Sequence, residues 1–329
     1  MTPSSLRRPR SRVAAAGLAA ALLLAACSSP EDPASPATGA APAETPTTPT
    51  TASPSPSPTE TAPSAELPGG GHVMFPERRI IALYGTPGTP AMGVLGEHDV
   101  EGAVALAKEK AEEYQAFSEE PVQPGFEIIT TIASASPGAD GNYSIAHTDD
   151  RLEPLIDAAE ENDIHVILDL QPGRNTFLTQ AKMYEDLLTR PHVSLALDPE
   201  WRLPEPDMRH IQTVGHVQAS EINEVSEWLA ELVREHDLPQ KMLIVHQFED
   251  QMIRNRADLD ASHEELALTL HMDGHGHRQL KLDTYERVTT DLPEGMWPAW
   301  KSFIDEDTPT WTPEETFDLD PKPWFVSYQ

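Results

Sequence analysis

The stretch Val193–Trp201, with the sequence VSLALDPEW, combines the pattern of a β-strand with two acidic residues. Successive side chains of a strand point to opposite faces, so Leu195 and Leu197 share one face. The other face carries small and then acidic side chains: Ser194, Ala196, Asp198 and Glu200. This pattern is typical of a barrel strand whose leucines meet surrounding helices while its small residues face the axis. Because proline cannot donate a ladder hydrogen bond, we expect the strand to end at Pro199.

Seven further segments have the composition of short buried strands: Arg79–Gly85, Phe126–Ser134, His165–Leu170, Lys241–Gln247, Leu266–Asp273, Gly295–Phe303 and Trp324–Gln329. Segments with helical spacing of apolar residues alternate with them: His98–Phe117, Asp149–Glu161, Thr176–Leu188, Ser220–His236, Asp250–Asp258 and Gln279–Thr289. Eight strands alternating with helices favour an α/β fold of the (β/α)8 TIM-like barrel type, here with its last helix missing. The alternative, an open doubly wound sheet, lacks the GxGxxG turn after the first strand.

The first 26 residues have the pattern of a signal peptide, with basic residues before the apolar run Val13–Ala26. The run is short for a membrane-spanning helix. It ends in Leu24-Ala25-Ala26-Cys27, which resembles the lipobox of bacterial lipoproteins. This resemblance implies cleavage before Cys27 and lipidation of its thiol, which would anchor the protein on the extracytoplasmic face of the cell membrane. Since Cys27 is the only cysteine, we expect no intramolecular disulfide.

Residues 27–71 are rich in Pro, Thr, Ser and Ala, and they include the run Ser53-Pro54-Ser55-Pro56-Ser57-Pro58. Such a composition buries little apolar area, so we expect a disordered linker after the lipidated cysteine. Residues 72–329 then form a single barrel domain, which we expect to be monomeric. The linker would let this domain work at a distance from the membrane.

The chain is strongly acidic, with 54 Asp and Glu residues against 23 Lys and Arg residues and a formal net charge of −31. Nucleic acid phosphates would repel such a surface, so we exclude nucleic acid as a partner. No glycine-rich phosphate-binding turn follows the first predicted strand, and we expect no cofactor.

The strand phases place polar side chains at one end of the predicted barrel. The candidate catalytic residues are the acids Asp169, Asp198, Glu200 and Asp273. The candidate substrate-binding residues are Tyr84, Gln171, Trp201, His246, Gln247, His271, Trp297, Trp300, Lys301 and Tyr328. Sugar rings stack on aromatic faces and their hydroxyls bind carboxylates and amides, so this set points to a carbohydrate.

Glycoside hydrolysis needs one carboxylic acid that protonates the leaving oxygen and a second carboxylate. We assign Glu200 as the general acid, with its pKa raised by neighbouring Asp198 and partial burial, and Asp198 or Asp169 as stabiliser or base. The alternative is a non-catalytic barrel that binds a glycan, in which Asp198 and Glu200 would be buried or ion-paired.

The segment His271–His277, HMDGHGH, offers a third interpretation, because imidazole and carboxylate groups at close spacing bind divalent metals. It would make the protein a metal-dependent hydrolase. No HExxH motif is present, and glycines between histidines also describe a surface loop. We therefore predict no metal site.

Four motifs are similar to those of a group of uncharacterised lipoproteins of high-GC Gram-positive bacteria with a glycoside-hydrolase-like barrel: ILDLQPGR, LALDPEW, HMDGHG and VSYQ. This resemblance implies an extracytoplasmic location and a barrel fold. Asp198-Pro199-Glu200 also resembles the Asp-x-Glu at the fourth strand of barrel muramidases and chitinase-like enzymes, which implies that the glutamate donates the proton. The first strand departs from that pattern because it ends in Tyr84, and the DxxDxDxE run is absent. We expect an enzyme that acts on a cell-envelope glycan.

Overall fold

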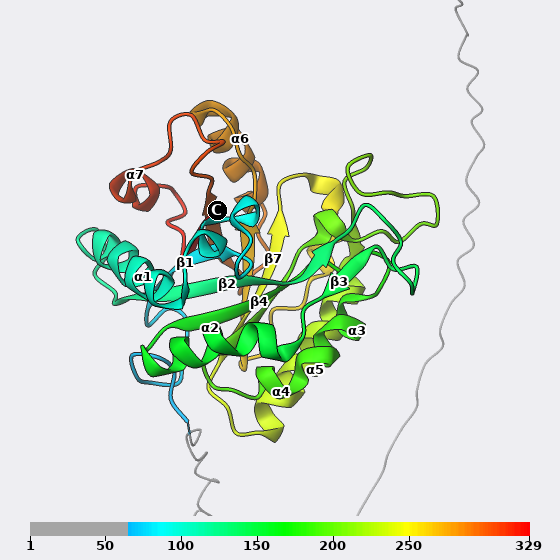
Figure 1. The fold of residues 1–329 in the computed structure, drawn as a ribbon. Coiled ribbons are helices and arrows are strands. Elements are labelled where there is room, and N and C mark those ends of the chain that lie inside the picture. Colours follow the sequence, from blue (N-terminus) through cyan, green and yellow to red (C-terminus); the bar gives the residue numbers. More distant parts are fainter. Residues whose placement is uncertain (1–64) are drawn as a thin grey trace, which may run out of the picture. The chain divides into compact units, whose positions relative to one another are not determined.

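The computed structural model describes residues 65–329, and they form a closed parallel barrel (Figure 1). Its strands are β1 (Arg79–Gly85), β2 (Val122–Ala133), β4 (His165–Leu170), β5 (Val193–Leu197), β7 (Lys241–Gln247), β9 (Leu266–Met272), β10 (Trp297–Ser302) and β11 (Phe325–Tyr328). Each strand is parallel to its neighbours, and β1 pairs with both β2 and β11, which closes the barrel. The predicted (β/α)8 TIM-like fold is confirmed. Within the described residues no helix follows β11.

Helices lie around the strands, with α1 and α7 on one flank and α3, α4 and α5 on another (Figure 1). The α-helices are α1 (Val100–Gln115), α2 (Asp149–Glu161), α3 (Phe177–Ala181), α4 (Glu185–Leu188), α5 (Ala219–Glu235), α6 (Arg278–Thr289) and α7 (Pro313–Phe317). The 3-10 turns are η1 (Pro90–Met92), η2 (Val94–Glu97), η3 (Lys182–Tyr184), η4 (Pro199–Trp201), η5 (Asp250–Met252) and η6 (Arg256–Asp258). Three short strands are β3 (Ser144–Ala146), β6 (Val217–Gln218) and β8 (Ile253–Arg254).

Two predicted helices differ from the observed elements. The segment Thr176–Leu188 is divided into α3, η3 and α4, and Tyr184 leaves helical geometry with a φ of −117°. The segment Asp250–Asp258 contains two 3-10 turns separated by β8, which pairs with β6. Asn255 adopts a left-handed conformation with a φ of 56°, and this interrupts a right-handed helix.

The two faces of the strand in Val193–Trp201 are as predicted. Leu195 and Leu197 belong to the apolar layer between the strands and the helices. Ala196 belongs to a second apolar cluster inside the barrel, together with Ile80 and Ile244. Because neighbouring residues of paired parallel strands share a face, the inner side of every strand follows from this register.

The N-terminal ends of the strands are closed by the segment that precedes β1. Leu67, Met74 and Phe75 are buried and join the inner cluster. The ring of Phe75 lies 5.6 Å from Trp297 and 5.7 Å from Trp324. The described structure thus includes residues 65–71, which we had assigned to the linker.

The predicted signal peptide, the lipidated Cys27 and the rest of the linker lie outside the described residues. Within residues 65–329, no helix has the length and apolar character needed to cross a membrane.

Candidate active site

A cavity of about 840 Å³ opens at the C-terminal end of the barrel. Each of the eight barrel strands places a residue in its lining, at or just after the strand's C-terminal end: Tyr84, Ala133, Gln171, Asp198, Phe248, Asp273, Lys301 and Gln329. Active sites of (β/α)8 barrels occupy this end, so the cavity is the candidate active site.

Asp198 and Glu200 both line this cavity. The turn η4 begins after Asp198, whose side chain accepts a hydrogen bond from the Glu200 backbone N–H at 3.2 Å. Asp198 is only 2% exposed, whereas Glu200 is half-buried. Neither carboxylate forms an ion pair with another residue of the described chain. The two acids that the sequence placed at the end of this strand therefore reach the same cavity.

Glu200 holds its proton more firmly than an ordinary glutamic acid. Burial raises its pKa to about 7, and the negative charge of Asp273 contributes in the same direction. We had expected neighbouring Asp198 to supply that charge. Burial raises the pKa of Asp198 well above its usual value, however, so this group loses much of the charge that would act on Glu200.

Asp273 shows the opposite behaviour. It is 8% exposed and accepts hydrogen bonds from His246 Nδ1 at 2.7 Å and from Lys301 Nζ at 3.3 Å. Burial opposes its ionisation, but the positive charges of Lys301 and His246 outweigh burial and lower the pKa of Asp273 well below its usual range. The cavity lining therefore carries an ionised carboxylate, Asp273, together with a carboxylic acid, Glu200.

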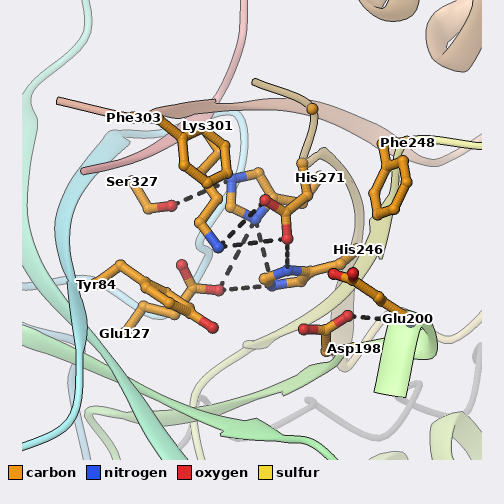
Figure 2. Close-up of polar contacts among 12 residues, drawn as sticks. Tyr84, Glu127, Asp198, Glu200, His246, Phe248, His271, Lys301, Phe303 and Ser327 are labelled. Atoms are coloured by element: carbon orange, nitrogen blue, oxygen red, sulfur yellow. Dashed lines mark hydrogen bonds and ion pairs between the residues drawn. The ribbon is translucent and has the colours of Figure 1, made fainter. Parts of the chain in front are cut away.

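His246, which contacts Asp273, belongs to a buried polar cluster with Glu127 and His271 (Figure 2). His246 Nε2 contacts Glu127 Oε1 at 2.8 Å, and His271 Nδ1 lies 3.4 Å from the same nitrogen. Burial opposes a charge on His246, but Glu127 and the hydrogen bond to Asp273 raise its pKa well above its usual value. Burial lowers the pKa of His271 to about 3, so this ring is neutral.

Glu127 is the central residue that the sequence analysis missed. It is fully buried in β2, in register with Tyr84 and Ile167 of the neighbouring strands. Its sequence feature was visible, because it is the one charged residue in the apolar run FEIITTIAS. A charged group at the centre of a buried strand needs a partner, which indicates a functional or paired site.

Tyr84 and Asp169 form a second pair beside this cluster. The Tyr84 hydroxyl donates a hydrogen bond to Asp169 Oδ2 at 3.0 Å, and Lys301 Nζ lies 3.5 Å from the centre of the Tyr84 ring. Burial raises the pKa of Asp169 to about 6. Lys301 thus connects Tyr84 with the ionised Asp273.

Most of the predicted site residues meet at this end of the barrel. Seven of them line the cavity: Tyr84, Gln171, Asp198, Glu200, Trp201, Asp273 and Lys301. Three others are fully buried and lie behind the lining instead of facing a substrate: Asp169, His246 and His271. Phe248 and Phe303, which the sequence analysis did not select, also line the cavity and flank the cluster in Figure 2.

The two tryptophans predicted on β10 do not reach the cavity. Trp297 begins β10 and lies at the opposite end of the barrel, where it packs on Phe75 and Trp324. Trp300 is fully buried on the outer face, and its ring lies 5.4 Å from Tyr285. Our assignment of both as substrate-binding was wrong, because alternate residues of a strand face opposite sides and only Lys301 combines the inner face with the C-terminal end.

Tyr328 and Gln247 also point away from the cavity. Tyr328 lies on the outer face, and its hydroxyl shares a hydrogen bond with that of Tyr114 at 2.7 Å. Gln247 donates to the Glu249 carbonyl and accepts from Arg256, so its amide holds the loop after β7. Both were predicted as substrate-binding, and both are corrected to packing positions.

We had considered the segment His271–His277 as an alternative metal site and had predicted none. His275 and His277 are exposed, and the His277 ring accepts a hydrogen bond from the Leu280 N–H at the start of α6. His271 and Asp273 of this segment do take part in metal-binding geometry, which occurs among residues 65–329 in two sets that share His246. One contains Glu127 and His271, and the other contains Asp198 and Asp273.

No known protein-family profile matches the chain. A search of curated proteins also finds no match. Among solved structures, the HpcH/HpaI aldolase from Desulfitobacterium hafniense DCB-2 aligns with 77% of this chain and 86% of that chain, at 10% identity and a TM-score of 0.38. The 5-methylcytosine deaminase from Klebsiella pneumoniae aligns with 63% of this chain and 44% of that chain, at 12% identity and a TM-score of 0.32. The barrel assignment depends on the strand pairing and not on these similarities.

Proposed function

We propose that this protein is a barrel enzyme that hydrolyses a glycan of the cell envelope, with Glu200 as general acid. The observation that carries the proposal is the pair of carboxyl groups in one cavity: Glu200, which keeps its proton near neutral pH, and Asp273, which is ion-paired with Lys301 at 3.2 Å. Two carboxyl groups held in different protonation states are the arrangement that glycosidic bond cleavage requires.

In the proposed reaction Glu200 donates its proton to the glycosidic oxygen as the bond to the leaving sugar breaks. A water molecule then adds to the anomeric carbon, and its proton returns to the Glu200 carboxylate. Asp273 faces the positive charge that develops on the sugar ring, and Lys301 and His246 keep it ionised before the sugar binds. Asp198 orients the Glu200 turn by accepting its backbone N–H. These roles retain Glu200 as predicted and give Asp273 the part that we had assigned to Asp198 or Asp169.

The lining of the cavity supports a carbohydrate substrate. Trp201, Phe248 and Phe303 provide apolar faces beside the carboxylates, and Gln171 provides an amide. A sugar presents apolar ring faces and a periphery of hydroxyls, and it binds through this combination. The alternative of a non-catalytic binder predicted that Asp198 and Glu200 would be buried or ion-paired. Asp198 is buried, at 2% exposure, but Glu200 is half-buried and has no ion pair within the described chain, so Glu200 is the acid that supports catalysis.

The location is proposed from the sequence. The resemblance of residues 24–27 to a lipobox supports an extracytoplasmic lipoprotein anchored through Cys27, with the barrel joined to the anchor by the proline-rich linker. An envelope glycan is the substrate class within reach of such an enzyme.

The test is the release of reducing ends from purified cell-wall glycans. We expect hydrolysis by the wild-type protein and a loss of about 10²- to 10⁴-fold in kcat in Glu200→Gln, which removes the proton donor with little change in shape. Glu112→Gln, at an exposed position of α1 outside the cavity lining, is the matched control and should remain within about twofold of wild type. Hydrolysis by Glu200→Gln at the wild-type rate would overturn the assignment.

A further inference from the structure

The buried cluster beneath the cavity brings three potential metal ligands to one point. Glu127 Oε1 and His246 Nε2 are 2.8 Å apart, His246 Nε2 and His271 Nδ1 are 3.4 Å apart, and His271 Nδ1 and Glu127 Oε1 are 3.8 Å apart. Bonds of about 2.0 to 2.1 Å in a tetrahedral site separate the ligand atoms by roughly 3.3 Å. The three observed separations lie around that value, so one ion can contact all three atoms with small adjustments.

The second nitrogen of each imidazole, the one directed away from Glu127, has a polar partner, as it does in known metal sites. His246 Nδ1 donates to Asp273 Oδ2 at 2.7 Å, and His271 Nε2 lies 3.3 Å from the hydroxyl of Ser327 (Figure 2). Histidine ligands commonly hydrogen-bond a carboxylate or another polar group through the nitrogen that does not contact the metal. With the outer nitrogens bonded to these partners, the inner nitrogens His246 Nε2 and His271 Nδ1 are the ones beside Glu127 Oε1. Metal binding displaces the proton that His246 Nε2 shares with Glu127 and releases it to solvent.

A separate observation comes from the second oxygen of Glu127. Oε2 is fully buried and has no hydrogen-bond partner among the described residues. Buried carboxylate oxygens in folded proteins are almost always paired, because an unpaired one loses its hydration without compensation. The Glu127 side chain is itself fully buried and belongs to the three-residue set with metal-binding geometry.

We propose that Glu127, His246 and His271 bind one divalent transition-metal ion, with zinc the best fit to two imidazoles and a carboxylate. The ion contacts His246 Nε2, His271 Nδ1 and Glu127, and the second oxygen of Glu127 is available to complete its coordination. Binding replaces the hydrogen bond between His246 and Glu127 with bonds from both residues to the metal. The outer hydrogen bond of His246 stays on Asp273, so the ion fixes the position of a carboxylate in the cavity lining.

This site differs from the one suggested by the sequence segment His271–His277. Only His271 of that segment takes part, since His275 and His277 are exposed and lie outside the set. The other two ligands come from β2 and β7, which the sequence alone does not bring together. The proposal concerns metal binding, so it does not depend on the hydrolase activity proposed above.

The experiment measures metal content in the full-length protein without a substrate. The protein is stripped with a chelator, reloaded with Zn²⁺, dialysed, and analysed by inductively coupled plasma mass spectrometry. We expect one Zn²⁺ ion per wild-type chain and a rise in Tm on adding Zn²⁺ to the stripped protein, because the folded state binds the ion. Glu127→Gln and His271→Gln should lose the bound ion.

The matched control is the double variant His275→Ala, His277→Ala, which removes the two exposed histidines and should keep one ion. Ser327→Ala leaves all three ligands in place and should weaken Zn²⁺ binding about 10- to 100-fold, as loss of an outer partner does. The Ser327→Ala variant still tests the proposal if the Glu127 and His271 variants fail to fold. Absence of both a bound ion and a Tm shift in wild type would overturn the proposal, as would a full Zn²⁺ content in folded Glu127→Gln.

Discussion

At the residue scale, the protonation state of each carboxyl group in the cavity depends on whether a positively charged side chain contacts it. Asp273 and Glu200 line the same cavity, but only Asp273 contacts Lys301 and His246. Glu200 has burial without a cation in contact, and its pKa rises to about 7. The difference between the two groups therefore comes from their contacts and not from their residue types.

This difference predicts the pH dependence of the proposed hydrolysis. A general acid acts only in its protonated form, so kcat should fall about tenfold per pH unit above the pKa of Glu200, near pH 7. The measurement is a pH profile of kcat on a natural glycan. An aryl glycoside whose leaving group needs no proton is the control, and its alkaline decline should be absent. A parallel decline for both substrates would contradict the role of Glu200.

The same scale shows what the sequence could and could not predict about the site. The acids Asp198, Glu200 and Asp273 were predicted because each follows a clear strand and the phase of the strand fixes its side. Glu127 was missed although its charge stands out in an apolar strand, because its partner His246 comes from a strand far away in the sequence. His246 is buried behind the cavity lining because of how neighbouring strands pack. The spacing of apolar residues along the sequence does not predict such burial.

At the element scale, a buried ion pair fastens α6 to the loop after β10. Lys281 of α6 donates a hydrogen bond to Asp307, and both side chains are fully buried. Asp307 also accepts the backbone N–H groups of Gly276 and Phe303, each at 3.0 Å. This single carboxylate therefore connects the loop before α6, the helix itself and the loop that leads to α7.

We predict that Asp307→Ala lowers the free energy of unfolding by about 3 to 5 kcal/mol, because it leaves the Lys281 charge buried without its partner. Urea denaturation followed by circular dichroism measures the change. The control is Asp157→Ala, which removes an ion pair at the surface. The Asp157 carboxylate lies 2.7 Å from the Arg190 guanidinium, and the Asp157 side chain is 61% exposed. Its effect should stay below about 1 kcal/mol. Equal effects of the two substitutions would show that the buried pair does not stabilise this corner of the barrel.

The elements themselves were predicted more fully than the site. All eight barrel strands were located, because each is a short apolar run and the inner face alternates with the outer one. The errors fall where tertiary contacts override local pattern. Asp250–Asp258 has helical spacing, yet β8 pairs with β6 inside it. Trp300 and Tyr328 lie on strands that lead to the cavity, yet both side chains face the surrounding helices. The register of β10 and β11 decides which face each side chain takes.

At the scale of the whole molecule, the two ends of the barrel bury different sets of titratable groups. The C-terminal end combines carboxylates with His246, His271 and Lys301. At the N-terminal ends of β4, β5 and β7, the basic groups His165, His192 and Lys241 are buried. Burial lowers the pKa of His192 to about 4 and that of Lys241 to about 7. These basic groups are stable in their neutral forms, so protons destabilise this end of the fold.

His192 allows this to be tested. Its pKa is about 4 in the folded protein and about 6.5 in an unfolded chain, so between these values the unfolded state binds more protons. The contribution of His192 to stability is present above pH 6.5 and is lost as the pH falls towards 4. Its full size is on the order of 3 kcal/mol. His192→Gln removes the titrating group but keeps a donor for the Ile156 carbonyl, which the ring contacts at 3.1 Å.

We therefore expect urea unfolding at a series of pH values to show a smaller loss of stability between pH 6.5 and pH 4 in His192→Gln than in wild type. His98→Gln, at an exposed position, should keep the wild-type dependence. Carboxylates of the cavity also titrate in this range, but they are common to both proteins and cancel in the difference. An identical pH dependence of wild type and His192→Gln would mean that the N-terminal end of the barrel accepts a charged imidazole, in spite of its burial.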